Sequence, residues 1–468
     1  MARLEDRLEE RGYSGNLLIM QSNGGMMSVE AARDFSVNTV LSGPAAGVIA
    51  ATKIAAESGF ENLIGYDMGG TSLDVSLVTE GKPVVSNGIE PEFGIPIMVS
   101  MIDIHTIGAG GGSIARIDEG GLLQVGPESA GAEPGPVCYG LGGTEPTVTD
   151  ANVILGRINP DYPIARAADF SFDLDTARSV LIEKIGQPLG LSLEETALAI
   201  LTIANNRIAG SIRRISIDRG HDPRDFVLFS FGGGGPLMVS FLLRELGVSQ
   251  ALVPYYPGIA SAWGCVIADL QHDFVTMINR RLSELDPTEA EGIFADHLAQ
   301  GEELIKSEQV PLTQVSVMRE AEISYEGQTH VIRTPLPAGP VSPGVIAESF
   351  RRAYLRQYGQ VDETFSGLET LLESIPIRLL NLRTAVVGMR PDLIPSPKTT
   401  LQDAQKGVRP VYVEDRFVEC PIYDRSLLPW GSEFSGPAVI EQADTTIWIE
   451  PWVRVRVDEG GNLFLSIA

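Results

Sequence analysis

Cysteine and histidine are scarce in this chain, which has 3 cysteines and 5 histidines among 468 residues. The cysteines are Cys138, Cys265 and Cys420, and they lie far apart with no C-x-x-C spacing. This pattern excludes a cysteine zinc cluster and argues against a disulfide framework. We therefore expect the protein to work in a reducing cytoplasm.

Basic residues are also few, because 35 Lys and Arg stand against 61 Asp and Glu, a net charge of −26. A field of this sign repels nucleic acids and anionic membranes, so we expect neither as a partner. The same field repels a nucleotide. A phosphate site would therefore need local backbone N–H groups and a divalent cation.

The chain has no apolar run of about eighteen residues, and it starts with a charged, amphipathic segment rather than a signal core. Hydrophobic residues make up 44% and charged residues 21%, as in globular proteins. The length fits two to four domains of roughly 100–200 residues each. Glycine is abundant, with 50 residues in short clusters that predict loops close to a ligand.

Short apolar runs, glycine loops and helical patterns alternate over residues 1–275 and predict an α/β domain, whereas residues 276–468 predict a smaller, β-rich α+β domain. The expected strands are Leu17–Met20, Leu63–Asp67, Val227–Phe231, Val315–Ser324 and Val453–Val457, the last paired with Leu463–Ile467. The expected helices are Ala45–Ser58, one that starts at the capping box Ser192-x-x-Glu195, and segments around 288–306 and 343–358. We expect residues 125–146 to form a long loop.

The segment from Asp67 to Asp74, DMGGTSLD, follows a predicted buried strand. Gly69 and Gly70 turn the chain with exposed N–H groups, and residues 73–78 alternate as a returning strand. Such a hairpin can wrap a phosphate while Asp67 and Asp74 hold a magnesium ion. An ordinary tight turn with two solvated carboxylates explains the same residues.

Two further glycine clusters stand out. Residues 107–113 begin like a dinucleotide fingerprint, but Ser113 replaces its third glycine and no helix follows, so we exclude that site. This loop either lines a ligand or forms a bulge. Gly232–Gly235 lie between a predicted strand and a helix that Pro236 opens, which favours contact with phosphate or adenosine over a packing role.

Asp103 and His105 are two residues apart on a predicted strand and therefore share one face. They are candidate metal ligands or an acid/base pair. A core histidine with a satisfied hydrogen bond is the alternative, since no third ligand is evident.

Together the motifs resemble those of the ATP-dependent hydantoinase A/5-oxoprolinase family, which includes N-methylhydantoinase A-type subunits and the nucleotide-binding subunits of acetone and acetophenone carboxylases. The matching segments span nearly the whole chain. They are Ile19–Gly25, Leu41–Gly47, Asp67–Asp74, Asp103–Ser113, Ala132–Pro136, Thr149–Asn152, Phe231–Leu237, Pro257–Gly264, Ala268–Phe274, Leu380–Arg383, Gly436–Glu441 and Thr445-Thr446.

The resemblance implies an actin/sugar-kinase/Hsp70-like (ribonuclease H-like) ATPase fold that binds ATP and Mg²⁺. It implies catalytic roles for Asp67, Thr71 and Asp74, with Asp67 and Asp74 as magnesium ligands. The implied cofactor-binding residues are Gly69, Gly70, Thr71, Ser72, Gly108, Gly110, Gly111, Gly232, Gly233, Gly234 and Gly235.

The function implied by the resemblance is that of the ATP-using subunit of a cyclic-amide hydrolase of the hydantoin or 5-oxoproline type. Such a subunit phosphorylates the ring carbonyl oxygen before hydrolysis and works with a hydantoinase B-type subunit. A subunit of an acetone carboxylase-like ligase and a non-catalytic assembly subunit are the alternatives. No sequence feature selects the substrate.

Two features depart from the family pattern. Met238 stands where family members commonly have His after the Gly-Pro-Leu of the last glycine loop. Family chains also normally begin with a separate lobe of about two hundred residues that carries a first phosphate loop. We expect that lobe to come from another chain or from upstream sequence, and the isolated chain to bind Mg·ATP weakly.

Overall fold

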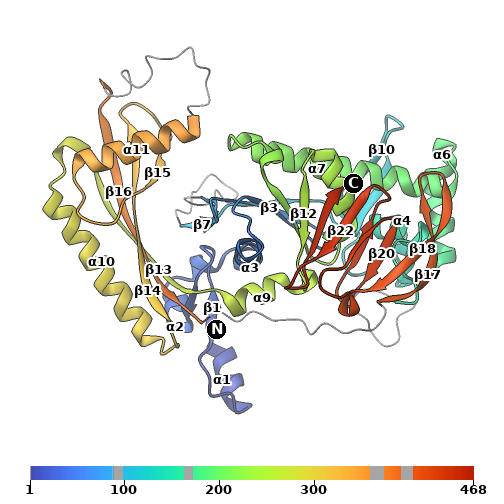
Figure 1. Cartoon of the computed structure of the whole chain (residues 1–468), viewed down its shortest axis with the longest axis horizontal. Coiled ribbons are helices and arrows are strands. Elements are labelled where there is room, and N and C mark those ends of the chain that lie inside the picture. The colour runs from blue at the N-terminus through green and yellow to red at the C-terminus, as the bar shows by residue number, and fades with distance from the viewer. Residues whose placement is uncertain (1, 87, 89–98, 163–171, 359–373, 392–403) are drawn as a thin grey trace. The chain divides into compact units, whose positions relative to one another are not determined.

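The computed structural model describes residues 2–86, 88, 99–162, 172–358, 374–391 and 404–468. The chain forms two compact units, each assembled from separate stretches of sequence (Figure 1). Unit 1 consists of Met1–Ser42, Ser86–Met101 and Cys265–Leu393, and unit 2 consists of Gly43–Val85, Ile102–Gly264 and Ile394–Ala468. Among the described residues, no helix combines the length and the apolar character needed to cross a membrane.

A mixed nine-stranded sheet forms the centre of unit 2. Its parallel strands are β3 (Leu63–Met68), β11 (Val227–Phe231) and β12 (Gln250–Val253), as the sequence predicted for the first two. Beyond β3, the strands β4 (Leu73–Thr79) and β8 (Ile104–Ile107) continue the sheet in antiparallel fashion. Short β5 (Lys82–Pro83) pairs with the end of β4.

Alternate residues of the parallel strands face two apolar cores. Leu63 and Phe229 pack in one core with the apolar residues of α3 (Ser42–Glu57). Their neighbours Ile64 and Leu228 belong to the other core. Side chains alternate along a strand, so a strand covered on both faces must be apolar at nearly every position, as β3 and β11 are. The second core also contains residues of helices α4 (Val148–Ile154), α5 (Leu174–Leu181), α7 (Leu193–Asp218) and α8 (Gly235–Leu246).

The C-terminal strands complete the sheet of unit 2. The last strand, β23 (Leu463–Ile467), pairs antiparallel with β12, and β22 (Val453–Val457) and β19 (Glu433–Ser435) follow it outward. The predicted pairing of residues 453–457 with 463–467 is confirmed. The compact units therefore do not follow a division of the chain at residue 275, since C-terminal strands belong to the sheet of unit 2. Without β23, the apolar strand β12 would form an exposed sheet edge.

A second sheet of unit 2 comes entirely from the C-terminal part of the chain. Its four strands are β17 (Gln405–Val413), β18 (Arg416–Asp424), β20 (Ala438–Glu441) and β21 (Thr446–Ile449). The Ser240 hydroxyl of α8 donates to the backbone carbonyl of Trp448 in β21, at 2.8 Å. Both sheets of unit 2 thus pack on α8 in one continuous core.

Unit 1 is built on a six-stranded sheet with an antiparallel centre. In order across the sheet its strands are β1 (Leu18–Met20), β2 (Met26–Ser28), β13 (Leu270–Arg281), β16 (Ile377–Met389), β14 (Gln314–Tyr325) and β15 (Ile332–Pro335). Two predicted helices, α10 (Pro287–Ser307) and α11 (Pro343–Tyr358), add Phe294 and Phe350 to its apolar core. Two further helices of this unit are α1 (Ala2–Glu10) and α2 (Val29–Asp34).

The predicted loop over residues 125–146 is partly wrong. Its start belongs to β10 (Leu123–Ser129), which pairs with β9 (Ser113–Ile117). The Asp118 carboxylate stabilises the turn between them by accepting hydrogen bonds from the N–H groups of Gly120 and Leu122. The strand depends on its partner for its hydrogen bonds, so its own Gly- and Pro-rich sequence did not show it. Two short strands, β6 (Val85–Ser86) and β7 (Met101–Ile102), form a separate pair.

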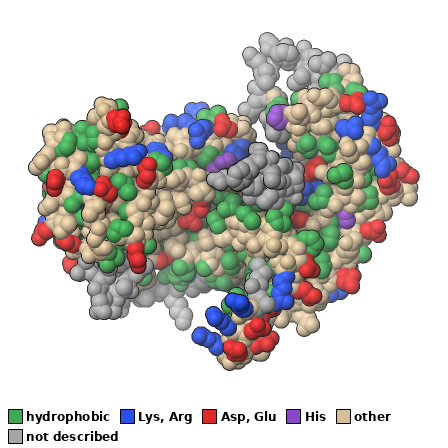
Figure 2. All heavy atoms as spheres, turned by 180° about the vertical axis from the view of Figure 1, so that it is seen from behind, with side chains coloured by type: hydrophobic (Ala, Val, Ile, Leu, Met, Phe, Trp, Pro, Cys, Tyr) green, Lys and Arg blue, Asp and Glu red, His purple; other side chains and the backbone are tan. Residues whose placement is uncertain are grey.

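On the face drawn in Figure 2, acidic side chains are not gathered in one place but are interspersed with basic ones. Several acidic side chains of the chain form ion pairs at the surface, such as Glu289 with Arg280 and Glu326 with Arg281. Exposed pairs of this kind add little stability, so the charge pattern limits partners rather than determining the fold.

A buried carboxylate organises the segment that follows β10. Asp150 in α4 has no exposed surface, and its oxygens accept hydrogen bonds from the N–H groups of Val137, Cys138 and Thr147 and from the Thr147 hydroxyl. Thr147 in turn caps the helix in a capping box. One side chain therefore fixes both the start of α4 and the backbone around residue 137.

We predict that Asp150→Asn destabilises the protein by on the order of 2–3 kcal/mol, because either orientation of the new amide points an NH₂ group at a buried N–H donor. Thermal unfolding should show a drop in Tm of roughly 5 °C or more. Asp173→Asn is the matched control. Asp173 caps α5 through Thr176 at an exposed position, and Asn caps a helix as well as Asp does. Equal Tm values for the two variants would contradict the anchoring role.

Candidate functional site

The hairpin of β3 and β4 carries the two predicted catalytic carboxylates. Asp67 and Asp74 are directly opposite each other in the register of the two strands. Directly opposed like charges destabilise a strand pair, so this arrangement is costly without a cation. Between them, Gly69, Gly70 and Thr71 form an exposed turn.

Three glycine loops interlock at this turn, all within unit 2. The backbone carbonyls of Met68, Gly69 and Gly70 accept hydrogen bonds from the loops 232–235 and 108–112. The donors are the N–H groups of Gly234 to Met68 at 2.9 Å, Gly111 to Gly69 at 3.1 Å, and Gly112 to Gly70 at 2.6 Å. The structure therefore brings together the three glycine clusters that the sequence singled out.

The interlocking determines where the turn's own N–H groups point. In a trans peptide the carbonyl and the following N–H point in opposite directions. Since the carbonyls of Gly69 and Gly70 point at the loop 108–112, the N–H groups of Gly70 and Thr71 point away from it. None of the backbone hydrogen bonds of the described residues uses these two N–H groups. They form a pair of exposed donors beside Asp67 and Asp74, suited to an anion.

Glycine is required where the loops meet. Gly232 has a φ of +81°, and a Cβ there would collide with Oδ1 of Asp67. At Gly110 a Cβ would lie 2.6 Å from the carbonyl oxygen of Gly70. Neither position admits a side chain unless the turn moves. The close approach accounts for glycine at these positions, which a simple loop does not need.

Asp67 has an unusual electrostatic environment. Burial and the negative charge of Asp74 raise the pKa of Asp67 to about 6, although a hydrogen bond from Ser261 opposes the shift. The Ser261 hydroxyl of α9 (Ala260–Ile267) donates to Oδ2 of Asp67 at 3.4 Å. Asp74 accepts a hydrogen bond of 2.6 Å from the Thr106 hydroxyl of β8. A positive charge placed beside Asp67 would favour its ionised form and oppose this rise of its pKa.

Not every predicted cofactor-binding glycine reaches this turn. Gly108 packs against Pro127 of β10, and Gly235 packs behind β3, where its carbonyl accepts a hydrogen bond from the Tyr66 hydroxyl. The backbone carbonyl of Ser72 accepts the N–H of Gly69 and closes the turn. These three residues support the loops, whereas the exposed donors belong to Gly70 and Thr71.

Asp103 and His105 form a separate cluster with Arg219. His105 Nε2 lies 3.1 Å from Asp103 Oδ1, and Arg219 Nε donates to Asp103 Oδ2 at 2.7 Å. Burial alone would raise the pKa of Asp103, but the hydrogen bond from His105 and the charge of Arg219 lower it below its usual value. No group of three or more His, Cys, Asp or Glu side chains suited to a metal ion occurs among the described residues. The geometry therefore favours an ion pair rather than a metal site. This ion pair joins the start of β8 to the end of α7.

The position of this cluster follows from strand alternation. Thr106 faces Asp74 on one side of the sheet, so His105 must face the other side, where α7 ends. The sequence placed Asp103 and His105 correctly beside each other but gave no sign of Arg219, which lies 114 residues from His105.

Sequence reasoning also missed Ser261, Asp444 and Thr445 as contributors to the site. The Thr445 hydroxyl donates to the Gly233 carbonyl at 2.9 Å, and Asp444 Oδ2 accepts the Gly258 N–H at 2.9 Å. Ser261 and Gly258 belong to the recognised segment PGIASAWG, and Thr445 to the pair Thr445-Thr446. These segments carried the family resemblance, but nothing local assigned them a role.

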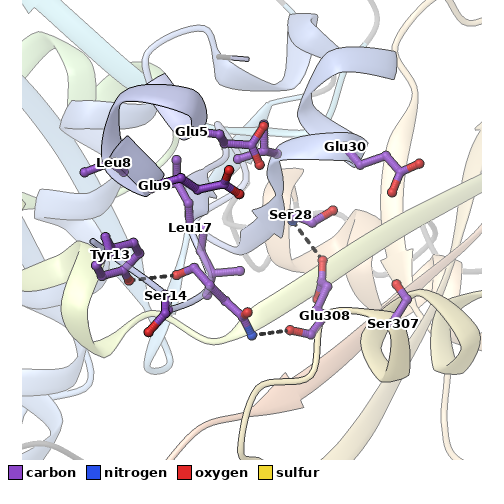
Figure 3. A pocket seen from close by; sticks show the side chains of 14 residues that line it. Glu5, Leu8, Glu9, Tyr13, Ser14, Leu17, Ser28, Glu30, Ser307 and Glu308 are labelled. Atoms are coloured by element: carbon purple, nitrogen blue, oxygen red, sulfur yellow. Dashed lines mark hydrogen bonds between the residues drawn. The ribbon is translucent and has the colours of Figure 1, made fainter. Parts of the chain in front are cut away.

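A pocket of 310 Å³ in unit 1 lies elsewhere (Figure 3). It is bounded by α1, the β1–β2 hairpin and the end of α10, and its lining includes Glu5, Glu9, Glu30 and Glu308. Glu308 Oε1 accepts the Ser28 N–H at 2.9 Å and ties the hairpin to α10. None of the predicted site residues lines this pocket, so it is separate from the glycine loops.

The family model for hydantoinase/oxoprolinase matches residues 1–274. The model for the hydantoinase/oxoprolinase C-terminal domain matches residues 289–465. The chain belongs to the hydantoinase/oxoprolinase family. The predicted resemblance is thereby confirmed.

Named relatives within this family are enzymes or their subunits, and two of these enzymes with solved structures are described as ATP-dependent. The caprolactamase subunit alpha of Pseudomonas jessenii is 33% identical to this chain, over 99% of this chain and 66% of its own length. The crystal structure of the ATP-dependent caprolactamase from the same organism matches with a TM-score of 0.82 at 31% identity. The match covers 100% of this chain and 67% of that one. The acetophenone carboxylase gamma subunit of Aromatoleum aromaticum is 33% identical over 98% of this chain and 64% of its length. The nucleotide-free structure of acetone carboxylase, an enzyme of ATP-dependent acetone carboxylation, matches with a TM-score of 0.76 at 26% identity, over 100% of this chain and 66% of that one.

The chain therefore spans about two thirds of the length of these relatives. The two solved structures confirm a mixed α/β fold for this family member. Their enzymes differ in what they act on, since one is named for a cyclic amide and the other for a ketone.

We predict that Asp67→Asn stabilises the metal-free protein. The pKa of about 6 in the native state exceeds the usual pKa of an aspartate, 3.8, so the native state favours the protonated acid. The ionised carboxylate therefore lowers the free energy of unfolding by its full amount above pH 6. The loss becomes smaller as the pH falls and disappears below about pH 4. Removing the charge should raise Tm by roughly 3–6 °C at pH 8 in EDTA, and the gain should about halve at pH 5.

Asp415→Asn at the exposed β17–β18 turn is the control and should shift Tm by less than about 1 °C at either pH. A gain for Asp67→Asn that is the same at both pH values would show that the charge is not its cause.

Proposed function

We propose that the chain is the ATP-using subunit of an enzyme that hydrolyses a cyclic amide of the hydantoin, 5-oxoproline or lactam type. The observation that carries the proposal is the pair of exposed N–H groups of Gly70 and Thr71 beside the opposed carboxylates Asp67 and Asp74. Family membership and the similarity to the caprolactamase subunit support it.

The residues of the hairpin fit a nucleotide phosphate with its cation. Two backbone N–H groups supply donors without charge, and two carboxylates supply oxygen ligands of the kind that Mg²⁺ prefers, with water and phosphate oxygens completing the shell. A cation would also remove the repulsion between Asp67 and Asp74. In a chain with a charge of −26, the attraction for a nucleotide must arise locally in this way.

ATP bound there would transfer its terminal phosphoryl group to the ring carbonyl oxygen and leave as ADP, which would make the carbonyl carbon easier for water to attack. After water adds, the ring C–N bond would break with the nitrogen leaving as a protonated amine, and hydrolysis of the remaining acyl phosphate would release phosphate. The chain's own part would be to hold the phosphates through Gly70, Thr71 and the loop at Gly233. Asp67 would hold the cation, and the Thr71 hydroxyl would bind a phosphate oxygen. We propose an actin-like arrangement for this lobe, supported by the parallel strands β3, β11 and β12 with their glycine loops at one end.

A ketone carboxylase is the second candidate, and the similarity to acetone and acetophenone carboxylase subunits supports it. In both candidates the chain works in a larger assembly, with a hydantoinase B-type subunit and with the N-terminal lobe that the family resemblance implies. Relatives named as alpha, beta and gamma subunits support an assembly of several chains.

The test is turnover by the reconstituted assembly with Asp67→Asn. We expect ATP-dependent turnover to fall by roughly 100-fold or more, because the change removes a charge that faces the cation while it keeps the shape. Release of phosphate and of product should be measured with caprolactam, 5-oxoproline and hydantoin, and with acetone plus bicarbonate. The ring-opened amino acid would identify the hydrolase, and a carboxylated ketone would identify the second candidate.

Asp415→Asn is again the control and should leave turnover within a factor of two of wild type. Turnover of Asp67→Asn at the wild-type rate would remove Asp67 from the mechanism. Absence of Mg·ATP binding by the chain in calorimetry, both alone and with the N-terminal lobe added, would refute the proposal as a whole.

A further inference from the structure

One hairpin turn of the C-terminal segment contacts the loops of the candidate nucleotide site. Residues Gln442–Thr445 connect β20 to β21 in unit 2. Three of its side chains reach away from their own sheet: Gln442 donates to the Tyr255 carbonyl at 2.8 Å, Asp444 accepts from the Gly258 N–H, and Thr445 donates to the Gly233 carbonyl. The pairing of β20 with β21 is complete without these contacts, so the small sheet itself does not require them.

The contacts of Thr445 and Asp444 are close and specific. Thr445 is fully buried, so its hydroxyl has no access to water as an alternative partner. A Cβ at Gly258 would lie 2.6 Å from the Asp444 backbone oxygen, which shows how closely the two backbones approach. The loops held by these two side chains are also joined to each other, since the Gly232 N–H donates to the Pro257 carbonyl at 2.9 Å.

The glycine loop needs such support from outside. Four successive glycines allow the loop many conformations, and ordering them costs more entropy than ordering other residues. Within the loop, the Gly234 N–H is fixed by Met68 and the Gly232 N–H by Pro257, which leaves Gly233 between them with its carbonyl held by Thr445. The Gly233 carbonyl and the Gly234 N–H belong to the same planar peptide, so Thr445 and Met68 hold this peptide from opposite sides.

We propose that the Gln442–Thr445 turn positions the glycine loop Gly232–Gly235, so that the C-terminal segment forms a working part of the nucleotide site. The inference rests on the proposed function for its consequence, nucleotide affinity, but not for the positioning itself. Thr445 is a positioning residue that acts through Gly233, and Asp444 is one that acts through Gly258.

Three variants of the full chain test the positioning. Thr445→Val keeps the shape and removes the hydroxyl, Thr445→Ser restores a hydroxyl, and Thr446→Val is the matched control. Thr446 is the next residue and is also buried, and within the described part of the chain its side chain makes no hydrogen bond to the glycine loop. Hydrogen exchange of the nucleotide-free chain should show faster exchange at residues 232–235 in Thr445→Val than in wild type. Thr445→Ser and Thr446→Val should exchange there as wild type does.

Calorimetry with Mg·ATP, with the N-terminal lobe added if the chain alone binds weakly, tests the consequence. We expect Thr445→Val to bind about 3- to 10-fold more weakly, as loss of one buried hydrogen bond implies. Thr445→Ser and Thr446→Val should bind within about twofold of wild type, even if Tm is lower in both valine variants. Affinity must be compared well below the lowest Tm, so that unfolding does not contribute.

The outcomes separate the two proposals. Unchanged exchange at residues 232–235 in Thr445→Val overturns the positioning role, whatever the nucleotide does. If exchange at residues 232–235 is faster in Thr445→Val but its affinity for Mg·ATP equals that of wild type, the turn does not contribute to nucleotide binding. If wild type itself binds no Mg·ATP while the exchange results are as expected, the proposed function fails and the positioning of the loop by Thr445 stands.

Discussion

Three consecutive carbonyls, those of Met68, Gly69 and Gly70, are the acceptors on which the site depends. They draw two distant glycine loops onto one hairpin turn, and by the geometry of the trans peptide they turn the N–H groups of Gly70 and Thr71 away from those loops. The glycines follow from this arrangement, since side chains at Gly110 and Gly232 would strike the turn. Glycine at these two positions thus has a local physical cause.

The same hairpin concentrates negative charge. Strand pairing places Asp67 opposite Asp74, and burial adds to the cost of keeping Asp67 ionised. Such a pair persists in a folded protein only where the surrounding structure holds it in place or where a ligand relieves it. Here both neighbouring strands and the Ser261 and Thr106 hydroxyls hold the carboxylates, and a divalent cation would relieve their repulsion. Under the proposed function, stability and cation binding would therefore be opposed at Asp67, as is common at functional sites.

Sequence reasoning succeeded where the signal is local. The hairpin around Asp67, the strand–glycine–helix unit at Gly232–Gly235 and the capping box at Ser192 depend on residues within about ten positions, and the structure contains them as predicted. It failed where a residue acts at long range. Thr445 is 212 residues from Gly233, and nothing in the sequence near either residue shows the contact. The pairing of β23 with β12 is hidden for the same reason, because register depends on the partner strand.

The C-terminal segment therefore contributes to the site in two ways that share one cause. By pairing with β12, β23 extends the sheet whose strands end at the glycine loops, and the Asn462 side chain beside β23 accepts the Tyr255 N–H at 3.1 Å. The turn after β20 holds the carbonyl of that same Tyr255 through Gln442. The backbone at Tyr255 is thus fixed from both sides by residues that lie about two hundred positions later in the chain. A loop fixed in this way loses little entropy when a ligand binds, which is the physical advantage of building one site from two distant parts of a sequence.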